Sequence, residues 1–194
     1  MQTRTLGRTG LDVSIIGFGG IPIRRPATDE AVELYRLGMD RGITFYDAAR
    51  AYVRCEERLG MALQGRRRED VVICSRDLSH TKAEMAAAID TSLQTLGTDY
   101  VDIYQCHELH QPQDLEECLG PGGALEALDE AREAGKIRFI GMTSHNPDVI
   151  ISGLETGLMD VILIMLNYVN RRMVEDVLPR AKALKIRPRR QLGQ

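Results

Sequence analysis

The sequence predicts an α/β protein whose strands lie parallel in one sheet. Short apolar runs alternate with amphipathic segments six times along the 194 residues. Several runs are apolar at consecutive positions rather than at alternate ones, which is typical of strands that are covered on both faces. Repeated strand–helix units of this kind indicate an α/β fold, and periodicity alone does not separate an open sheet from a closed barrel.

Each expected strand is an apolar run bounded by polar or turn-forming residues. The six runs are residues 13–19, 43–47, 71–75, 101–106, 137–143 and 161–167. The first run leads into GFGGIP (17–22), which lacks the third glycine of a G-x-G-x-x-G motif. A Rossmann dinucleotide site is therefore not expected.

The expected helices lie between these runs, and the clearest one begins at a capping box. The Thr81 hydroxyl can accept a hydrogen bond from the backbone N–H of Glu84, whose side chain can reach back. Apolar residues then recur at a spacing of three or four up to Leu96, and Gly97 ends the helix. The same pattern predicts helices at residues 29–41, 56–63, 123–134, 147–156 and 172–184.

The composition is that of an ordinary globular protein and argues against several classes of function. With 43% hydrophobic and 27% charged residues the chain can bury a core, and its net charge of −3 argues against nonspecific nucleic-acid binding. No apolar run approaches the roughly 18 residues of a membrane helix, and no signal peptide is expected. The four cysteines lack CxxC spacing, so we expect neither zinc nor disulfides and predict a cytoplasmic location.

Polar residues gather where the expected strands end. Asp47 ends the second strand, with Tyr52 in the loop after it, while Arg76 follows the third strand and His107 the fourth. The carboxyl ends of parallel strands meet at one edge, where α/β proteins place their functional groups. We therefore expect an acid, a phenol, a guanidinium and an imidazole to share one site.

These side chains suit proton donation to a carbonyl group. A tyrosine is a weak acid with a pKa of about 10, and a neighbouring cation such as Arg76 is expected to lower that pKa. Asp47 can hold the cation, while His107 can orient the substrate oxygen or share the proton. His107 and His110 have no evident third ligand, so no metal site is expected.

At these residues the sequence resembles the aldo-keto reductases, which are TIM-barrel enzymes that pass hydride between NADPH and a carbonyl. The matching segments follow in order along almost the whole chain. They are RTLGRTGLDVSIIGFGGIP (4–22), GITFYDAARAY (42–52), EERLGMAL (56–63), SLQTLGTDYVDIYQCH (92–107) and GALEALDEAREAGKIRFIGMTSH (123–145). The last two are specific to the family, while the segment around residues 46–57 and the GPGGALEAL stretch (120–128) are similar to a bacterial or archaeal branch.

The resemblance implies catalytic roles for four residues. Tyr52 would be the general acid, and Asp47 its supporting carboxylate. His107 would orient the substrate, a small aldehyde or ketone. Arg76 stands where the family has a catalytic Lys; it keeps the positive charge but is longer and planar, so weaker activation of Tyr52 is expected.

The cofactor implied by the resemblance is NADPH. Thr143 and Ser144 fall where the family uses a Ser–Asn pair to hold the nicotinamide amide. The loop after the first strand, which passes the cofactor by its backbone, corresponds to Gly19, Gly20 and Ile21. The sixth strand departs from the family pattern, because Leu163 replaces a Gln that contacts nicotinamide and Leu166 replaces a Tyr.

The resemblance also implies an incomplete barrel. A complete TIM barrel takes about 250 residues, whereas the apolar pattern here stops before RPRRQLGQ (187–194). We expect residues 1–194 to form one partial domain of about six strand–helix units, without strands 7 and 8, the closing helices and the adenosine-phosphate site. Open sheet edges would favour self-association. A second hypothesis is a non-catalytic pseudoenzyme or binding subunit that keeps the fold, as in the potassium-channel β-subunit branch.

Overall fold

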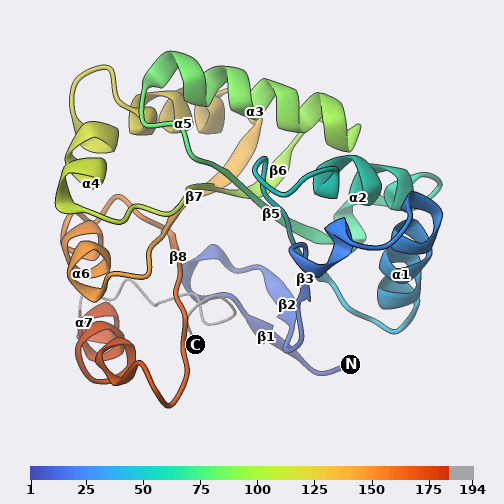
Figure 1. Ribbon diagram of the computed structural model, residues 1–194, viewed down its shortest axis with the longest axis horizontal. Coiled ribbons are helices and arrows are strands. Elements are labelled where there is room, and N and C mark those ends of the chain that lie inside the picture. Colours follow the sequence, from blue (N-terminus) through green and yellow to red (C-terminus); the bar gives the residue numbers. More distant parts are fainter. Residues whose placement is uncertain (184–194) are drawn as a thin grey trace.

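The computed structural model describes residues 1–183 and has a curled, six-stranded parallel sheet at its centre (Figure 1). Neighbouring strands in the sheet follow one another along the chain. In this order they are β3 (Phe18–Gly19), β4 (Phe45–Asp47), β5 (Val72–Asp77), β6 (Val101–Cys106), β7 (Ile137–Thr143) and β8 (Val161–Leu163). The predicted α/β fold is confirmed, and the described residues form an incomplete barrel of the TIM type with β3 and β8 at its edges.

Helices cover the outer, convex side of this sheet (Figure 1). They are α1 (Thr28–Asp40), α2 (Cys55–Leu63), α3 (Lys82–Leu96), α4 (Pro112–Leu119), α5 (Ala124–Glu133), α6 (Pro147–Glu155) and α7 (Leu178–Ala183), which continues a π-helical turn at Met173–Val177. Three short 3₁₀ helices lie at Gly7–Thr9, Pro22–Arg24 and Arg68–Asp70. In the described part of the chain, no helix is long and apolar enough to cross a membrane.

The start of α3 shows how local sequence sets these boundaries. Thr81 Oγ1 accepts a hydrogen bond from the backbone N–H of Glu84 at 3.4 Å, so the predicted N-cap is confirmed. At the other end, Gly97 has a φ of +65°, a left-handed conformation that glycine adopts without steric cost. The predicted helix boundaries therefore hold to within one residue here.

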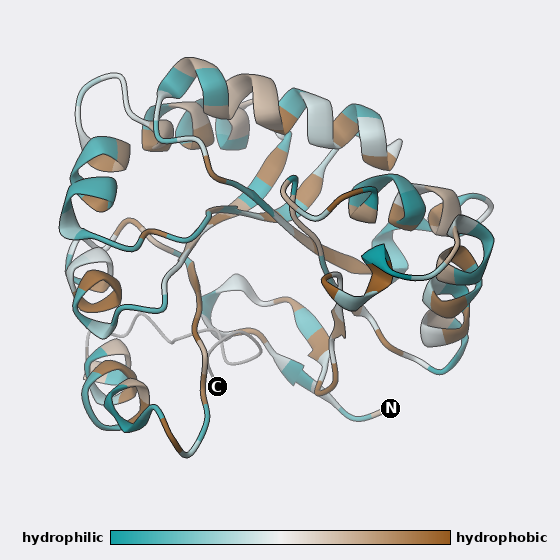
Figure 2. Ribbon diagram, viewed as in Figure 1, coloured by the Kyte–Doolittle hydropathy of each residue, from teal (hydrophilic) through white to brown (hydrophobic). Residues whose placement is uncertain are grey.

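Alternate side chains of each strand enter two different apolar layers. Tyr46, Ile73 and Tyr104 point outward and pack under the helices. Their neighbours along each strand, such as Phe45 and Ile103, point to the opposite side, into the curl of the sheet. Figure 2 shows the corresponding pattern, with hydrophobic residues concentrated on the strands and hydrophilic ones on the outer turns of the helices. Burial on both sides explains why these runs are apolar at consecutive positions.

An antiparallel hairpin closes the amino-terminal end of the sheet. It pairs β1 (Thr3–Thr5) with β2 (Asp12–Ser14). Three hairpin residues, Leu6, Leu11 and Val13, pack in the inner layer. Arg8 at its tip donates hydrogen bonds to the Asp160 carboxylate at 2.8 Å and 3.0 Å and to the Met159 carbonyl at 3.0 Å. This hairpin links the amino ends of strands that lie far apart in the chain.

The predicted first strand at residues 13–19 was wrong, because this run is divided between the hairpin and the parallel sheet. Val13 belongs to β2, and only Phe18 and Gly19 join the parallel sheet. The run breaks because the Ser14 hydroxyl donates to the Ile16 carbonyl at 2.6 Å, which turns the chain and leaves Ile15 and Ile16 exposed.

One further prediction was wrong in its extent, and one helix was not predicted. The last strand ends at Leu163 rather than at residue 167, because Met165 and Leu166 lie exposed beyond the edge of the sheet. Helix α4 was not predicted, although Pro112 at its first turn and the Gln111–Asp114 capping box mark its start. The expectation that residues 187–194 contain no seventh strand lies outside the described residues, as does the predicted end of the last helix at residue 184.

Candidate active site

A cavity of about 240 Å³ opens at the carboxyl ends of the parallel strands. It brings together the four side chains that were predicted to share a site: Asp47, Tyr52, Arg76 and His107. Three of the four stand at strand ends, where consecutive parallel strands aim inward-facing residues at one point. Tyr52 comes from the loop between β4 and α2.

Arg76 and Asp47 form the charged floor of this cavity. The Arg76 Nη2 group pairs with the Asp47 carboxylate, as predicted, and Arg76 Nε donates a hydrogen bond to the Ala48 carbonyl at 3.2 Å. The Arg76 side chain is only 2% exposed. Burial lowers the pKa of Arg76 to about 10, so the guanidinium is still charged at neutral pH, and Asp47 compensates that charge.

Tyr52 faces both the arginine and the histidine. Its ring centre lies 5.8 Å from the Arg76 guanidinium carbon and 5.7 Å from the centre of the His107 ring, which it meets edge to face. The pKa of Tyr52 is raised above 10.0, first by burial and then by the Glu108 carboxylate. A cation does lower this pKa, as predicted, but it is Arg24 rather than Arg76, and burial outweighs it.

His107 follows β6 and lies under the mouth of the cavity. Its side chain is 4% exposed, and within residues 1–183 its Nδ1 atom has no hydrogen-bond partner. Burial and the Arg76 charge lower the pKa of His107 to about 4. The imidazole is therefore neutral at physiological pH and can offer one donor and one acceptor nitrogen.

The two hydroxyl residues after β7 are engaged with the loop that follows β6. Thr143 Oγ1 accepts a hydrogen bond from the Glu108 N–H at 2.7 Å, and Ser144 Oγ donates to the Leu109 carbonyl at 2.5 Å. Both residues line the cavity and are nearly fully buried. Their predicted contact with a nicotinamide amide stays a prediction.

The loop after β3 reaches the same cavity through Ile21. Its two glycines differ in their surroundings. A side chain at Gly20 would come within 2.5 Å of the Asp47 carbonyl and of Cys55 Sγ, so close packing requires glycine there. Gly19 has open space where a side chain would be, which leaves its backbone accessible as the cofactor prediction requires.

Sequence reasoning gave no role to Glu108, which lines the cavity, or to Gln105, a buried strand residue that lies outside the lining. Glu108 lines the cavity, with its carboxylate 3.8 Å from His107 Nε2 and 3.7 Å from His110 Nε2. Gln105 lies opposite Arg76 in the sheet register and is fully buried, and its Nε2 atom lacks a hydrogen-bond partner within the described chain. Gln105 stands two positions before His107 and so faces the same side of the strand, which was the available signal for it. Glu108 carried none.

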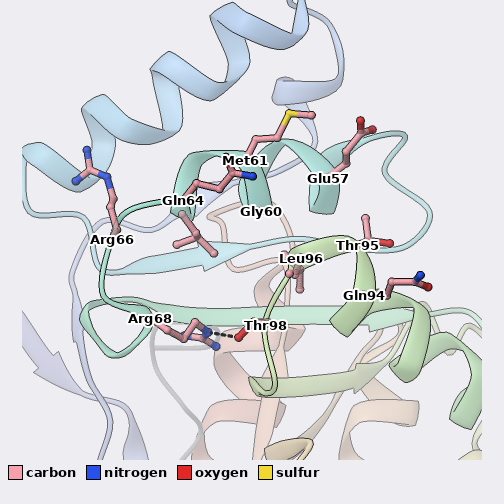
Figure 3. Close-up of a pocket in the computed structure, with 12 residues that line it drawn as sticks. Glu57, Gly60, Met61, Gln64, Arg66, Arg68, Gln94, Thr95, Leu96 and Thr98 are labelled. Atoms are coloured by element: carbon pink, nitrogen blue, oxygen red, sulfur yellow. Dashed lines mark hydrogen bonds between the residues drawn. The ribbon is translucent and has the colours of Figure 1, made fainter.

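A second cavity, of about 400 Å³, lies between α2 and α3 near the amino ends of the strands (Figure 3). Its two arginines are already paired. Arg66 contacts Asp40 at 2.9 Å, while Arg68 binds Thr98 and the Asp102 carboxylate. The first cavity therefore holds the candidate active site. No group of three or more potential metal ligands occurs among residues 1–183.

Comparisons with known proteins agree with this geometry. The model of the aldo/keto reductase family matches residues 15–187. L-galactose dehydrogenase of Arabidopsis thaliana is 32% identical over 201 residues, which cover 94% of this chain and 62% of that protein. The chain spans about 60% of the length of the curated relatives it matches along most of its own length.

Solved structures give the same result. The holo form of aldo-keto reductase AKR11C1 from Bacillus halodurans superposes with a TM-score of 0.83 at 28% identity, covering 95% of this chain and 64% of that one. An aldo/keto reductase from Klebsiella pneumoniae, in complex with NADP and acetate, gives 0.78 at 26% identity, with 94% and 65% covered. The chain belongs to the aldo/keto reductase family.

Proposed function

We propose that this site reduces aldehydes or ketones with a nicotinamide cofactor and that Tyr52 donates the proton. The observation that carries the proposal is the meeting of Tyr52, His107 and the Asp47–Arg76 pair at one cavity. The raised pKa of Tyr52 keeps its phenol protonated, and the lowered pKa of His107 keeps its imidazole neutral. Both can therefore hydrogen-bond an uncharged carbonyl oxygen.

The residues of this chain divide the work as follows. His107 and Tyr52 orient the carbonyl oxygen. A reduced nicotinamide held beside Ile21, Thr143 and Leu163 would be the source of hydride for the carbonyl carbon. Tyr52 Oη transfers its proton to the oxygen as negative charge develops there, and the resulting phenolate regains a proton from solvent. The buried Arg76 cation stabilises the transient negative charge, while Asp47 keeps Arg76 in position.

NADPH is the cofactor we propose. Ile21, Thr143 and Leu163 line the cavity and supply an apolar wall and a hydroxyl group for the nicotinamide end. Among the described residues that line the cavity, Arg76 is the one lysine or arginine, and it is committed to Asp47. The described residues thus fit the nicotinamide end and provide no free cation for the phosphates. The relative solved with NADP supports this choice.

A second candidate function is a non-catalytic subunit that binds the cofactor without turnover. Two observations favour it. Arg76 holds Asp47 and a backbone carbonyl, and the pKa of Tyr52 is raised rather than lowered. Both make Tyr52 a weaker acid than a site tuned for proton donation requires. In either case the four buried cysteines, which form no disulfide within the described residues, suit a reducing compartment, and a cytoplasmic location stays part of the proposal.

The test measures binding and turnover separately. Because the chain contains no Trp, the fluorescence of bound NADPH reports binding without interference. Oxidation of NADPH is then followed at saturating cofactor over a panel of aldehydes and ketones. Tyr52→Phe should lower kcat by about 10³-fold and leave NADPH affinity unchanged. Tyr168→Phe, at a site that is 91% exposed, is the matched control.

Each outcome separates the two functions. Turnover that Tyr52→Phe abolishes supports the reductase. NADPH binding without oxidation of any carbonyl supports the non-catalytic subunit, and turnover that Tyr52→Phe leaves intact contradicts the role of Tyr52.

A further inference from the structure

Glu108 is held at the mouth of the cavity by its backbone. It has a φ of +55°, a left-handed conformation that is uncommon for a residue with a side chain. The Glu108 N–H donates to Thr143 Oγ1 at 2.7 Å, and this bond ties the turn to the end of β7. The side chain therefore leaves the turn in a set direction, toward the two imidazoles of His107 and His110.

The charges around the cavity do not balance. Its lining includes one arginine and two carboxylates: Arg76, Asp47 and Glu108. Asp47 pairs with Arg76, whereas Glu108 contacts imidazoles, of which His107 is neutral near pH 7. The carboxylate of Glu108 is 42% exposed, so it faces whatever enters the cavity. Among the charged side chains that line the cavity, carboxylates therefore outnumber guanidinium groups by one, and Glu108 is the exposed one.

We propose that Glu108 determines substrate specificity by excluding carbonyl compounds that carry a carboxylate or another anionic group near the reacting carbon. Neutral and cationic aldehydes or ketones are the class that this mouth admits. The proposal extends the reductase function, and the expected effect of Glu108 on kcat/KM rests on that function. Glu108 itself takes no part in proton transfer. Like charges at close range in a partly desolvated cavity repel one another, and the effect weakens in salt.

The first experiment measures binding without turnover. Benzoate, benzamide and benzamidinium have similar shapes and differ in charge, and ligand-observed NMR gives their affinities for the whole chain. We expect benzoate to bind about tenfold more weakly than benzamide, and benzamidinium at least as tightly. Glu108→Gln keeps the shape of the side chain and should bring the three affinities to within about twofold. Glu117→Gln is the control, because Glu117 is 66% exposed and contacts His80 away from the cavity.

The second experiment compares kcat/KM for 4-carboxybenzaldehyde and its neutral methyl ester. Glu108→Gln should raise the ratio of the acid to the ester by about tenfold, and added salt should raise it in the unmodified chain. Failure to reduce either aldehyde contradicts the reductase function and leaves the binding result to decide the role of Glu108. Equal affinities for the three probes, no binding of any probe, or an unchanged order in Glu108→Gln overturns the proposal.

Discussion

The two ends of the parallel sheet differ in whether their buried polar atoms have hydrogen-bond partners. At the amino end, Asp102 accepts hydrogen bonds from Arg68 at 2.8 Å, from Arg138 at 2.7 Å and from the Ile73 N–H at 3.0 Å. At the carboxyl end, polar atoms of His107 and Gln105 are buried and have no hydrogen-bond partner within residues 1–183. Both oxygens of Asp102 thus have partners, whereas these atoms of His107 and Gln105 have none within the described residues.

This difference indicates that the amino end stabilises the sheet and that the carboxyl end carries the chemistry. A satisfied buried carboxylate locks strands together, and removing one partner leaves uncompensated charge. An unsatisfied buried group costs free energy unless a ligand completes it. The carboxyl end therefore gives up stability that the amino end supplies, and three variants test this division.

The largest expected effect is the loss of stability when the Asp102 carboxylate at the amino end is removed. Asp102→Asn leaves Arg68 and Arg138 without their shared carboxylate, so we expect the free energy of unfolding to fall by about 3 kcal/mol. Urea unfolding at pH 7 measures it. Asp90→Asn is the control, since Asp90 is 60% exposed in its pair with Lys136 and should change stability by less than about 0.5 kcal/mol. Equal losses in both variants would contradict the contrast between the ends.

A smaller effect concerns pH and the carboxyl end. The pKa of His107 is about 4 in the fold and about 6.5 in an unfolded chain, so the unfolded state binds a proton first as pH falls. The stabilisation is present above pH 6.5 and is lost as pH falls toward 4, amounting to about 2 kcal/mol between pH 7 and pH 5.

This pH dependence should belong to one residue. Urea unfolding at pH 7 and pH 5 is expected to show it in the unmodified chain and in His145→Gln, where the histidine is exposed. It should be reduced by about 2 kcal/mol in His107→Gln. An unchanged dependence in His107→Gln would show that its imidazole is not desolvated.

The smallest expected effect is a change in kcat when Arg76 is replaced. Arg76→Lys replaces a planar group, held by Asp47 and the Ala48 carbonyl, with a compact charge. We expect this to favour the Tyr52 phenolate and to raise kcat about tenfold. Steady-state kinetics at saturating NADPH measure it, and Arg68→Lys at the other end of the sheet should leave kcat per folded molecule unchanged. A kcat unaffected by Arg76→Lys would mean that the arginine does not limit activation of Tyr52.

The sequence predicted the centre of the sheet better than its borders. The strands β6 and β7 were placed correctly because burial on both faces leaves long apolar runs with definite ends. The hairpin was missed since β1 is three exposed polar residues, TRT, without an apolar pattern to reveal it. Residues 164–166 continue the apolar run of β8 without joining the sheet, so composition there overestimated the strand.

The site was predictable in its residues and less so in its electrostatics. Strand-end positions brought Asp47, Arg76 and His107 to one cavity as expected. Whether the pKa of Tyr52 is raised or lowered depends on how deeply its ring is buried, and the sequence does not give that depth. The position of the Glu108 side chain depends on a positive φ at this residue. Glutamate rarely adopts that conformation, so the sequence did not predict it.

The hairpin at the amino end also sets an order of events during synthesis. Each parallel strand pairs with the strand made just before it, so the sheet can grow as the chain emerges. Arg8, however, binds Asp160, a residue 152 positions later. At ribosomal rates this is a wait of roughly 8–30 s. Over that interval the inner layer that covers Leu6, Leu11 and Val13 is completed strand by strand, and its last member, Val161, directly follows Asp160, so the hairpin is fastened only when the layer above it is complete.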